Sequence, residues 1–433
     1  MRKNESVSRR NFIKTTGLAT AGGAIALNMG LSNPSLGKGS DTLKVGLIGC
    51  GGRGSGAANQ ALNADPNVVL TAMADIFEDR LEESYANLKK IHPDKVKVSK
   101  KNKFVGFDAY QKVLESGVDV VLLAAPPAFR PEHFMASVKA GKHVFTEKPM
   151  AVDAPGIRKT QEAARLAKEK SLSVVAGYCW RFHYPKREIM KRIHEGQIGD
   201  VNCIYASQNA DLYWHRDRKP GWSDNEYNMR NWGRFNWISG DMIAEFAVHT
   251  LDLLSWAMGD KAPIKATGTG GRQVYQDGVI GNNFDHFAVM FEYENGAKGF
   301  HFSRRQNDCD RSYGLDIVGT KGQALIDCSR NKHKITGPEK WRFKGEDNEM
   351  YQTEHDELFA AIRKGEPIND GDWMCNSTML AILGRLVAYT GKTITWEEAL
   401  NSEEVFGPPT ESYSWDMKWP DIKEAQPGIT KFY

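Results

Sequence analysis

The sequence lacks three features that would each point to a particular class of protein. Its 433 residues include six cysteines, scattered without the paired spacing of a zinc or iron–sulfur site. Lysine and arginine (57) nearly balance aspartate and glutamate (54), and no long basic tract occurs. Beyond residue 40, no apolar run approaches the length that spans a membrane. We therefore expect free, buried thiols, no bound metal, no nucleic-acid partner and no membrane span.

Glycine, by contrast, is plentiful (41 residues), and residues 43–56 hold it in an informative pattern. An apolar run with the length and composition of a buried parallel strand opens this stretch. Gly49, Gly51 and Gly54 follow in the spacing G-x-G-x-x-G and lead into a helix-compatible segment. In a dinucleotide site these glycines allow the turn out of the strand, the approach of the pyrophosphate, and close helix–strand packing. The alternative is a glycine-rich turn in another α/β protein.

An aspartate at the end of the next apolar run favours the nucleotide site. Residues 68–74 have the pattern of a second strand, and Asp75 ends it about 20 residues after the last glycine. A carboxylate at this place hydrogen-bonds the adenine ribose and repels a 2′-phosphate. We therefore predict NAD as the cofactor. NADP remains the alternative, because Arg53 and Arg80 are available to bind a phosphate.

Strand and helix patterns alternate in the first part of the chain and change character in the second. The first part has predicted strands at 118–125, 143–145 and 173–177, and predicted helices at 106–115, 131–140 and 154–170. The second part has β-rich runs at 201–207, 264–270, 285–293, 298–303, 313–318 and 323–326, with helices at 186–195, 353–364 and 372–389. We predict an α/β protein: an N-terminal Rossmann domain with a doubly wound parallel sheet, and a C-terminal α+β domain with a large, mostly antiparallel open sheet.

The predicted division of the chain has four parts. Residues 1–40 form an export signal and linker, 41–178 the nucleotide-binding domain, 179–405 the α+β domain, and 406–433 a surface tail. Within the third part, residues 211–240 are rich in Trp, Arg, Asn and Gly, and we interpret them as an ordered loop near a substrate. Thr395 and Glu398 form a capping box for a last short helix.

The export signal is an interpretation of residues 8–14, S-R-R-N-F-I-K, which resemble a twin-arginine signal. A mild Gly/Ala-rich apolar segment follows at residues 15–27. We therefore expect a periplasmic protein that is exported already folded. A disordered basic tail is the alternative.

Several motifs together carry a family resemblance over residues 43–400. Besides the glycine loop and Asp75, they are P-P-x-x-x-P-x-H at 126–133, A-G-K-H-V-F-T-E-K-P at 140–149, G-Y-C-W-R-F at 177–182 and G-D-M-I-A-E-F-A-V-H-T-L-D at 240–252. In this order and spacing the chain resembles the Gfo/Idh/MocA family of nicotinamide-dependent sugar oxidoreductases. The resemblance implies cofactor contacts from Gly49, Gly51, Gly52, Arg53, Gly54, Asp75, Ala125, Pro126, His133, Glu147, Lys148 and Arg181.

The resemblance also implies the catalytic residues. Lys148 would lie beside the nicotinamide, where an ammonium stabilises a developing alkoxide, with Pro149 in the cis form to direct it. His249 would take the hydroxyl proton, since the pKa of a histidine lies near working pH. Glu245 precedes it in E-x-x-x-H spacing on a predicted helix at 243–256, although many relatives carry Asp there. Tyr178 is either a further acid–base group or a core tyrosine.

A carbohydrate site fits the remaining polar and aromatic residues. The predicted substrate-binding residues are Lys148, Trp214, His215, Arg230, Trp232, Trp237, Glu245 and His249. Aromatic faces stack on the C–H surfaces of sugars, and Arg and His bind hydroxyls. Ordinary aromatic packing is an equal alternative for the tryptophans. No metal-ligand spacing is evident.

The export signal changes the expected function. Outside the cytoplasm there is no appreciable pool of free nicotinamide, so we expect a tightly bound, internally recycled cofactor. The first interpretation is oxidation of a ring hydroxyl of a sugar or glycoside, at C3 by preference, with hydride returned to a carbonyl acceptor. The alternatives are a redox-neutral glycoside hydrolase or lyase acting by oxidation and elimination, and a non-enzymatic sugar-binding protein. A partner lyase or hydrolase, and a homodimer or homotetramer, are also expected.

Overall fold

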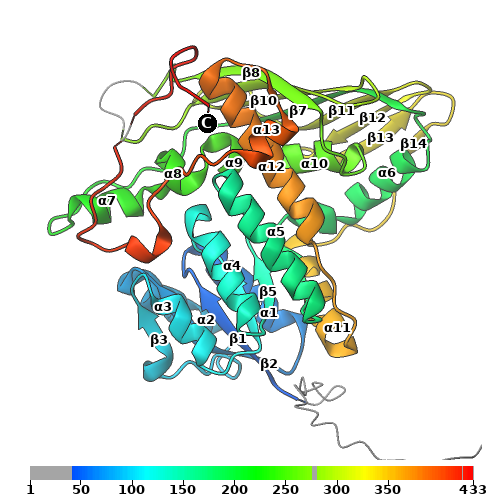
Figure 1. Cartoon of the computed structure of the whole chain (residues 1–433). Coiled ribbons are helices and arrows are strands. Elements are labelled where there is room, and N and C mark those ends of the chain that lie inside the picture. Colours follow the sequence, from blue (N-terminus) through cyan, green and yellow to red (C-terminus); the bar gives the residue numbers. More distant parts are fainter. Residues whose placement is uncertain (1–40, 276–279, 422, 433) are drawn as a thin grey trace, which may run out of the picture. The chain divides into compact units, whose positions relative to one another are not determined.

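Two sheets organise the residues that the computed structural model describes, which are 41–275, 280–421 and 423–432 (Figure 1). The predicted export signal, residues 1–40, lies outside the described residues. No helix in the described ranges is both long enough and apolar enough to cross a membrane. All six cysteines are free, and three of them, Cys50, Cys179 and Cys375, are buried.

The first sheet has six parallel strands in the order β3-β2-β1-β4-β5-β6. The strands are β1 (Leu43–Ile48), β2 (Val68–Asp75), β3 (Lys103–Val105), β4 (Val120–Leu123), β5 (His143–Thr146) and β6 (Val174–Ala176). The helices that follow them are α1 (Gly52–Ala64), α2 (Glu78–Ile91), α3 (Ala109–Glu115), α4 (Arg130–Lys139) and α5 (Ala154–Glu169). This is the predicted doubly wound sheet. Its strand order reverses between β1 and β4, which is where such sheets bind ligands.

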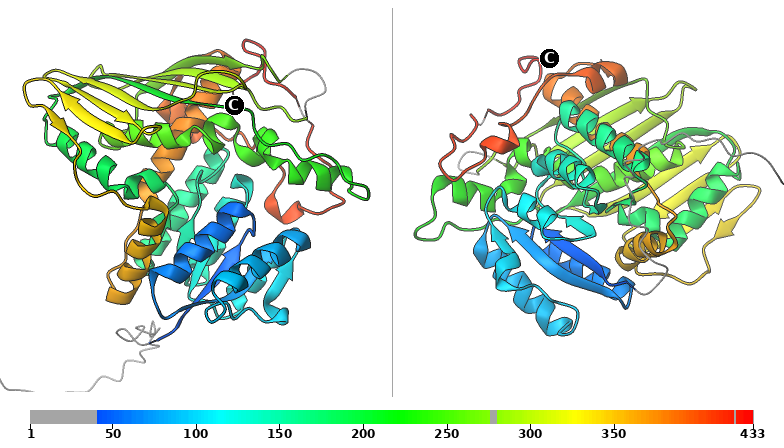
Figure 2. Two further views of the ribbon diagram at one scale, coloured as in Figure 1. Left: turned by 180° about the vertical axis from the view of Figure 1, so that it is seen from behind. Right: turned by 60° about the horizontal axis from the view of Figure 1, so that its bottom comes forward.

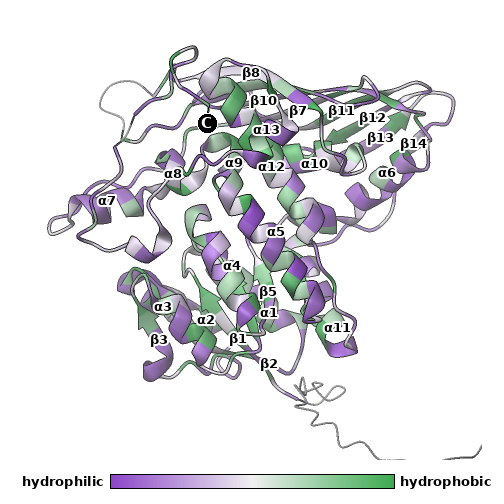
Figure 3. Cartoon of the chain, in the orientation of Figure 1, coloured by the Kyte–Doolittle hydropathy of each residue, from purple (hydrophilic) through white to green (hydrophobic). Residues whose placement is uncertain are grey.

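Both faces of this sheet are covered, as its continuous apolar strands require. Val120 and Leu122 of β4 pack with α1 and α2, whereas Val121 and Leu123 pack with α3, α4 and α5. Successive side chains of a strand point to opposite faces, so β4 contributes to two separate cores. Figure 3 shows the apolar residues concentrated in the strands and on the inward sides of the helices.

The second sheet has nine strands in the order β14-β13-β12-β11-β7-β10-β9-β8-β15. They are β7 (Val201–Ala210), β8 (Lys265–Gly271), β9 (His286–Glu292), β10 (Lys298–Arg305), β11 (Ser312–Gly319), β12 (Gln323–Asp327), β13 (Lys332–Thr336), β14 (Trp341–Arg342) and β15 (Ile394–Thr395). Every pair is antiparallel except β7 with β10. The prediction of a mostly antiparallel sheet is confirmed. Helices cover one of its faces, as Figure 2 shows from two further directions.

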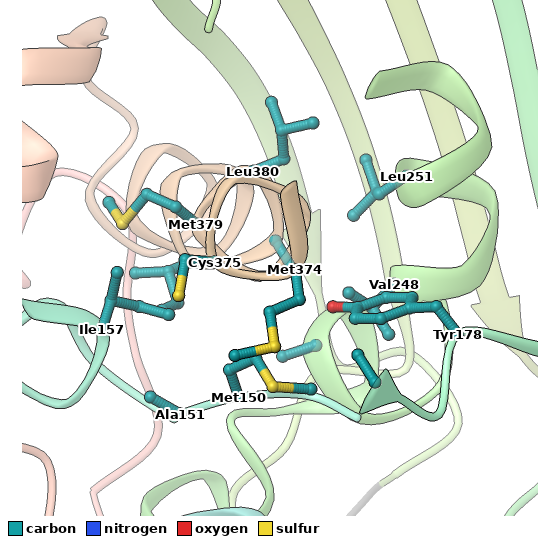
Figure 4. Close-up of a cluster of buried hydrophobic side chains, with 14 of the residues drawn as sticks. Met150, Ala151, Ile157, Tyr178, Val248, Leu251, Met374, Cys375, Met379 and Leu380 are labelled. Atoms are coloured by element: carbon teal, nitrogen blue, oxygen red, sulfur yellow. The ribbon is translucent and has the colours of Figure 1, made fainter. Parts of the chain in front are cut away.

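Helix α12 (Gly371–Thr390) connects the two halves of the core. Its residues are buried along almost the whole length, against α5, β8 and α10 (Val248–Ala257). Figure 4 shows Met374 of α12 between Met150 and Val248, and Cys375 beside Ile157. A helix buried on all sides is apolar all round rather than amphipathic.

The chain returns to the first sheet after building the second one. Helix α11 (Met350–Lys364) packs Leu358, Phe359 and Ile362 into the core beside α1. The backbone N–H of Val174 in β6 then bonds to the carbonyl of Ile368. Contacts of the first sheet are therefore shared by residues on both sides of the boundary predicted at 178.

Three segments around the second sheet differ from prediction or refine it. Residues 211–240, predicted as a loop, contain α7 (Asp224–Arg230), a 3₁₀ turn and α8 (Asn236–Ser239). The predicted helix at 243–256 is broken into α9 (Met242–Glu245) and α10. The capping box at Thr395 and Glu398 is confirmed at the start of α13 (Trp396–Asn401).

Candidate functional site

The glycine loop leaves its backbone open at the end of β1. A Cβ added to Gly54 would lie 1.9 Å from the carbonyl oxygen of Gly49, so α1 packs on the loop only with glycine there. Cβ atoms added to Gly51 or Gly52 would meet nothing within 4 Å. Helix α1 starts at Gly52 with no side-chain cap. Its first N–H groups and the positive end of its dipole therefore suit a pyrophosphate.

A cavity lies beside this loop, where β1 and β4 end; we call it the switch-point cavity. Six predicted cofactor residues line it: Gly49, Gly51, Asp75, Ala125, Pro126 and His133. Three predicted substrate residues, Trp214, Arg230 and Trp232, line it too. The second half of the chain thus supplies one wall of the cavity that the first sheet opens.

Asp75 is held at the edge of the switch-point cavity by two backbone N–H groups. Cys50 donates to one carboxylate oxygen at 2.6 Å and Phe77 donates to the other at 2.9 Å. Burial raises the pKa of this carboxyl above its usual value. Each oxygen keeps a further acceptor position for a ribose hydroxyl. Arg80 and Arg216 line the same cavity.

His133 is a neutral, buried member of the cavity wall. Burial and the nearby positive charge of Arg130 lower its pKa to about 3. Its ring stacks on Tyr110 with centroids 4.2 Å apart. Neither ring nitrogen has a hydrogen-bond partner within the described chain, which leaves both for a bound molecule.

Lys148 follows β5, and the Lys148–Pro149 peptide bond is cis, as predicted. The Arg130 guanidinium, a buried group that the sequence analysis overlooked, donates to the carbonyls of Pro149 at 3.2 Å and Ala125 at 2.8 Å. It ties the turn that carries Lys148 to the end of β4. The only signal for it was its place inside the P-P-x-x-x-P-x-H motif.

Lys148 meets the predicted catalytic residues of the second half. Its Nζ donates to the backbone carbonyl of Glu245 and lies 3.7 Å from Glu245 Oε1. His249 is buried, and burial together with the positive charge of Lys148 holds its pKa well below the usual value. The imidazole is therefore neutral, and its Nδ1 has no partner among the described residues. Such a group can accept a proton.

A break between α9 and α10 brings Glu245 and His249 to Lys148, which corrects the prediction of one continuous helix. Gln208 of β7 donates to the Phe246 carbonyl at 2.9 Å, and its Oε1 accepts from the Thr250 N–H at 3.1 Å. These bonds satisfy backbone groups that an unbroken helix would pair internally. The Glu245 carbonyl, at the last residue of α9, is left to accept from Lys148.

Tyr213 completes this group and was missed in the sequence. Its hydroxyl donates to Glu245 Oε2, and burial together with the negative Glu245 raises its pKa well above normal. The sequence analysis noted its neighbour Trp214 in the same aromatic stretch but not the tyrosine itself. Lys148, Tyr213, Glu245 and His249 are referred to below as the lysine cluster.

Other predicted cofactor and acid–base residues make contacts within the fold. The Tyr178 hydroxyl lies 2.8 Å from Thr378 Oγ1 in the core shown in Figure 4. Arg181 is buried and pairs with Asp252 at 2.9 Å. Arg53 and the buried Glu147 form an ion pair at 3.0 Å. The predicted roles of Tyr178, Arg181, Arg53 and Glu147 remain predictions. Their contacts are of the kind that would hold the residues of the site in place.

Some of the predicted substrate residues likewise make contacts within the fold and do not line the switch-point cavity. Trp237 packs against Trp419 and Tyr413 in an aromatic cluster beside the switch-point cavity but does not line the cavity. His215 is partly exposed and packs on Tyr227. No cluster of three or more His, Cys, Asp or Glu side chains suited to a metal occurs in the described ranges.

Comparison with known proteins agrees with this architecture. Residues 43–178 match the model described as "Oxidoreductase family, NAD-binding Rossmann fold", and residues 187–325 match "GFO/IDH/MocA C-terminal domain". Myo-inositol 2-dehydrogenase of Thermotoga maritima is 23% identical over 293 residues, 66% of this chain and 75% of that protein. A 2,7-anhydro-N-acetylneuraminate hydratase of Mediterraneibacter gnavus is 27% identical over 217 residues, about half of each chain (48% and 51%).

Solved structures share the fold at low sequence identity. Aldose-aldose oxidoreductase from Caulobacter crescentus, complexed with glycerol, has a TM-score of 0.65 and 17% identity, covering 82% of this chain and 99% of that one. Levoglucosan dehydrogenase, in complex with NADH and levoglucosan, has a TM-score of 0.62 and 18% identity, with the same coverage. The family models, the Rossmann sheet with its open glycine loop and the mostly antiparallel second sheet lead to one conclusion: the chain belongs to the GFO/IDH/MocA family of NAD-binding oxidoreductases.

Proposed function

We propose that the protein oxidises a ring hydroxyl of a sugar or glycoside, at C3 by preference, to a ketone. The observation that carries this proposal is the lysine cluster, in which the Lys148 ammonium after β5 lies close enough to the neutral imidazole of His249 in α10 to lower its pKa. The sugar and inositol dehydrogenases among the similar proteins support the substrate class. C3 is preferred because a ketone there acidifies the neighbouring C–H bond.

Each residue of the lysine cluster has its own role in the proposed reaction. His249 takes the hydroxyl proton as the C–H bond breaks, and the Lys148 ammonium stabilises the negative charge that develops on the oxygen. Glu245 orients Lys148 through its carbonyl and carboxylate, and Tyr213 in turn holds that carboxylate. Bound NAD supplies the acceptor for the hydride. The open backbone at Gly51 and Gly52 is the feature that fits its pyrophosphate.

NAD is the proposed cofactor rather than NADP. Asp75 at the edge of the switch-point cavity places a carboxylate where a 2′-phosphate would have to lie. Comparing the dissociation constants of NADH and NADPH by fluorescence tests this, and equal or tighter NADPH binding would contradict it. Arg80 and Arg216 are the residues that would then explain the preference.

We further propose that this cofactor is tightly held in a periplasmic enzyme. Support comes from two sets of contacts along the outer wall of the cavity. Arg230 of α7 makes two bonds of 3.0 Å to Asp79 of α2, joining the two halves of the chain. Trp415 of the C-terminal segment packs against Phe77 and Phe107, both cavity-lining, at centroid distances of 5.4 and 4.9 Å. These contacts must open for a nucleotide to leave.

Absorbance near the reduced-nicotinamide band tests the proposed reaction. The exported protein, purified without added nucleotide, should gain this absorbance when a substrate glycoside is added, and a keto-sugar should appear. If an added carbonyl compound then returns the absorbance to its starting value, that compound identifies the class of the hydride acceptor. Absence of hydride transfer from every glycoside tried, in protein shown to contain NAD, would overturn the proposal.

A redox-neutral hydrolase or lyase is the second candidate, favoured by the likeness to a 2,7-anhydro-N-acetylneuraminate hydratase. Oxidation, elimination, addition of water and reduction would then occur at the lysine cluster. The products separate the two reactions: free monosaccharide without net reduction of the cofactor indicates the second.

A homodimer or homotetramer completes the proposal. The uncovered face of the second sheet exposes Tyr205 and Phe302, whose rings lie 5.3 Å apart, together with Val318. Such a patch is typical of an interface. Light scattering should give two or four chains, and Tyr205→Glu should reduce that number.

A further inference from the structure

We propose that the substrate carries a carboxylate and that Arg305 binds it, so that the enzyme acts on sugar acids. This rests on the proposed oxidation at the lysine cluster and names its substrate class. Alternation along β10 places Arg305 on the same face as His301 and Ser303, both of which are buried. Arg305 is the last residue of that strand and projects toward the α9–α10 break.

The Arg305 guanidinium has no counter-ion among the residues that the structure describes. Its charged group packs over the rings of Tyr213 at 3.9 Å and Phe246 at 4.3 Å. No ion pair or side-chain hydrogen bond involves it within residues 41–275, 280–421 and 423–432, and its buried Nε has no partner. A partly buried cation without a partner is unfavourable unless something binds it.

Neighbouring arginines on the same side of the sheet differ in this respect. Arg234 donates to the Tyr213 carbonyl at 3.0 Å, and Arg181 is paired with Asp252. Arg304, next in the chain but on the opposite face of β10, donates to the Asp310 carbonyl at 2.7 Å. Each of these three guanidinium groups has at least one oxygen partner, whereas that of Arg305 has none among the described residues.

Two side chains connect Arg305 to Lys148. Arg305 contacts the ring of Tyr213, whose hydroxyl bonds to Glu245, which in turn contacts Lys148. In the proposed complex, a sugar with one hydroxyl at Lys148 places its carboxylate at Arg305. The Tyr275 hydroxyl is close enough to Arg305 for the positive charge to lower its pKa, although burial raises that pKa overall, and this hydroxyl offers a second donor.

Charge balance selects an acidic substrate. Lys148 and Arg305 carry two positive charges, Glu245 supplies one negative charge, and His249 is neutral. One substrate carboxylate would neutralise the remainder. The planar fork of a guanidinium matches the two oxygens of a carboxylate.

The test uses matched pairs of acidic and neutral glycosides on the NAD-loaded enzyme. Methyl glucuronides are compared with methyl glucosides, and methyl galacturonides with methyl galactosides, in both anomers. Binding is measured by calorimetry and turnover by absorbance. Wild-type enzyme should bind at least one acid about 10- to 100-fold more tightly than its neutral counterpart, as a charge-assisted pair predicts.

Variants assign this preference to the guanidinium. Arg305→Met should abolish the preference, Arg305→Lys should keep only part of it, and the control Arg304→Met should keep it in full. Melting temperatures monitor folding. The proposal is overturned if no acid binds better than its neutral counterpart, if Arg305→Met retains the preference, or if Arg304→Met loses it equally.

Calorimetry also separates this inference from the proposed reaction. Arg305-dependent binding of acids that are never oxidised would support the carboxylate site and contradict the oxidation. Oxidation of neutral sugars without any preference for acids would contradict the carboxylate site alone.

Discussion

The switch-point cavity and the lysine cluster are built in different ways. The nucleotide-binding edge of the cavity depends on the backbone of one short loop and on Asp75, all within residues 43–75, although the second half of the chain supplies another wall. The lysine cluster draws Lys148, Tyr213, Glu245 and His249 from three separate stretches of the chain. A dinucleotide presents the same pyrophosphate in every relative, whereas substrates vary, so local backbone suits the first and adjustable side chains suit the second. Damage to one region should therefore leave the other intact.

The largest difference between effects on the lysine cluster and effects on the switch-point cavity is expected from Lys148→Ala. Loss of the ammonium removes the stabilisation of the developing alkoxide, so kcat/KM should fall by about 10²- to 10³-fold. The NADH dissociation constant should stay within about twofold, since cofactor affinity depends on the glycine loop. Stopped-flow reduction and fluorescence titration measure the two quantities. A rate close to that of the wild type would remove Lys148 from the mechanism.

Breaking the Arg230–Asp79 contact should have the opposite effect, changing cofactor release and not the chemical step. Arg230→Ala removes both bonds to Asp79, a pairing with an almost fully buried guanidinium. NADH release should accelerate by about tenfold, because a charge-assisted contact of this kind stabilises by about 1.5 kcal/mol or more. The chemical step at saturating cofactor should be unchanged. Arg218→Ala, which removes an exposed pair with Asp224 of the same segment, is the matched control and should not alter release.

The break between α9 and α10 offers a test of the lysine cluster through its support. Gln208→Leu leaves the Phe246 carbonyl and the Thr250 N–H without their side-chain partner. Unfolding free energy should drop by about 1–3 kcal/mol. The kcat should fall as Glu245 loses its position, with NADH affinity unaltered. A change in cofactor affinity without a change in kcat would show that the break serves the cavity instead.

The smallest expected effect is a pH dependence of the unfolding free energy, and it comes from His355, which packs against the first sheet. Burial lowers the pKa of His355 to about 3, and its ring packs against Phe145 at 4.2 Å. The unfolded chain binds a proton there near pH 6.5, so the folded state loses stability as pH falls from 6.5 toward 3. His355→Phe should remove about 1.4 kcal/mol of this loss per pH unit. Denaturant titrations of both proteins at pH 7, 6 and 5 measure the difference, and parallel curves would contradict it.

Local patterns were sufficient for the parts of the molecule that short-range chemistry controls. The turn at the G-x-G-x-x-G spacing and the Thr395–Glu398 capping box each involve neighbours in sequence, and each forms as predicted. The two sheet types followed from continuous and alternating apolar runs for the same reason. Lys148 and His249 were found through the family resemblance, not through any periodicity.

Tertiary structure decided the rest, because the groups involved are far apart in the chain. An apolar pattern at residues 243–256 predicts one helix, and only Gln208 from a neighbouring strand divides it. Tyr213 and Arg305 give no local signal, since their importance lies in contacts with Glu245 and Phe246. The sequence by itself determined that a nucleotide-binding loop is present and that a lysine, Lys148, follows the fifth strand of the first sheet. Which side chains lie around Lys148 was determined by long-range packing, which no short stretch of sequence contains.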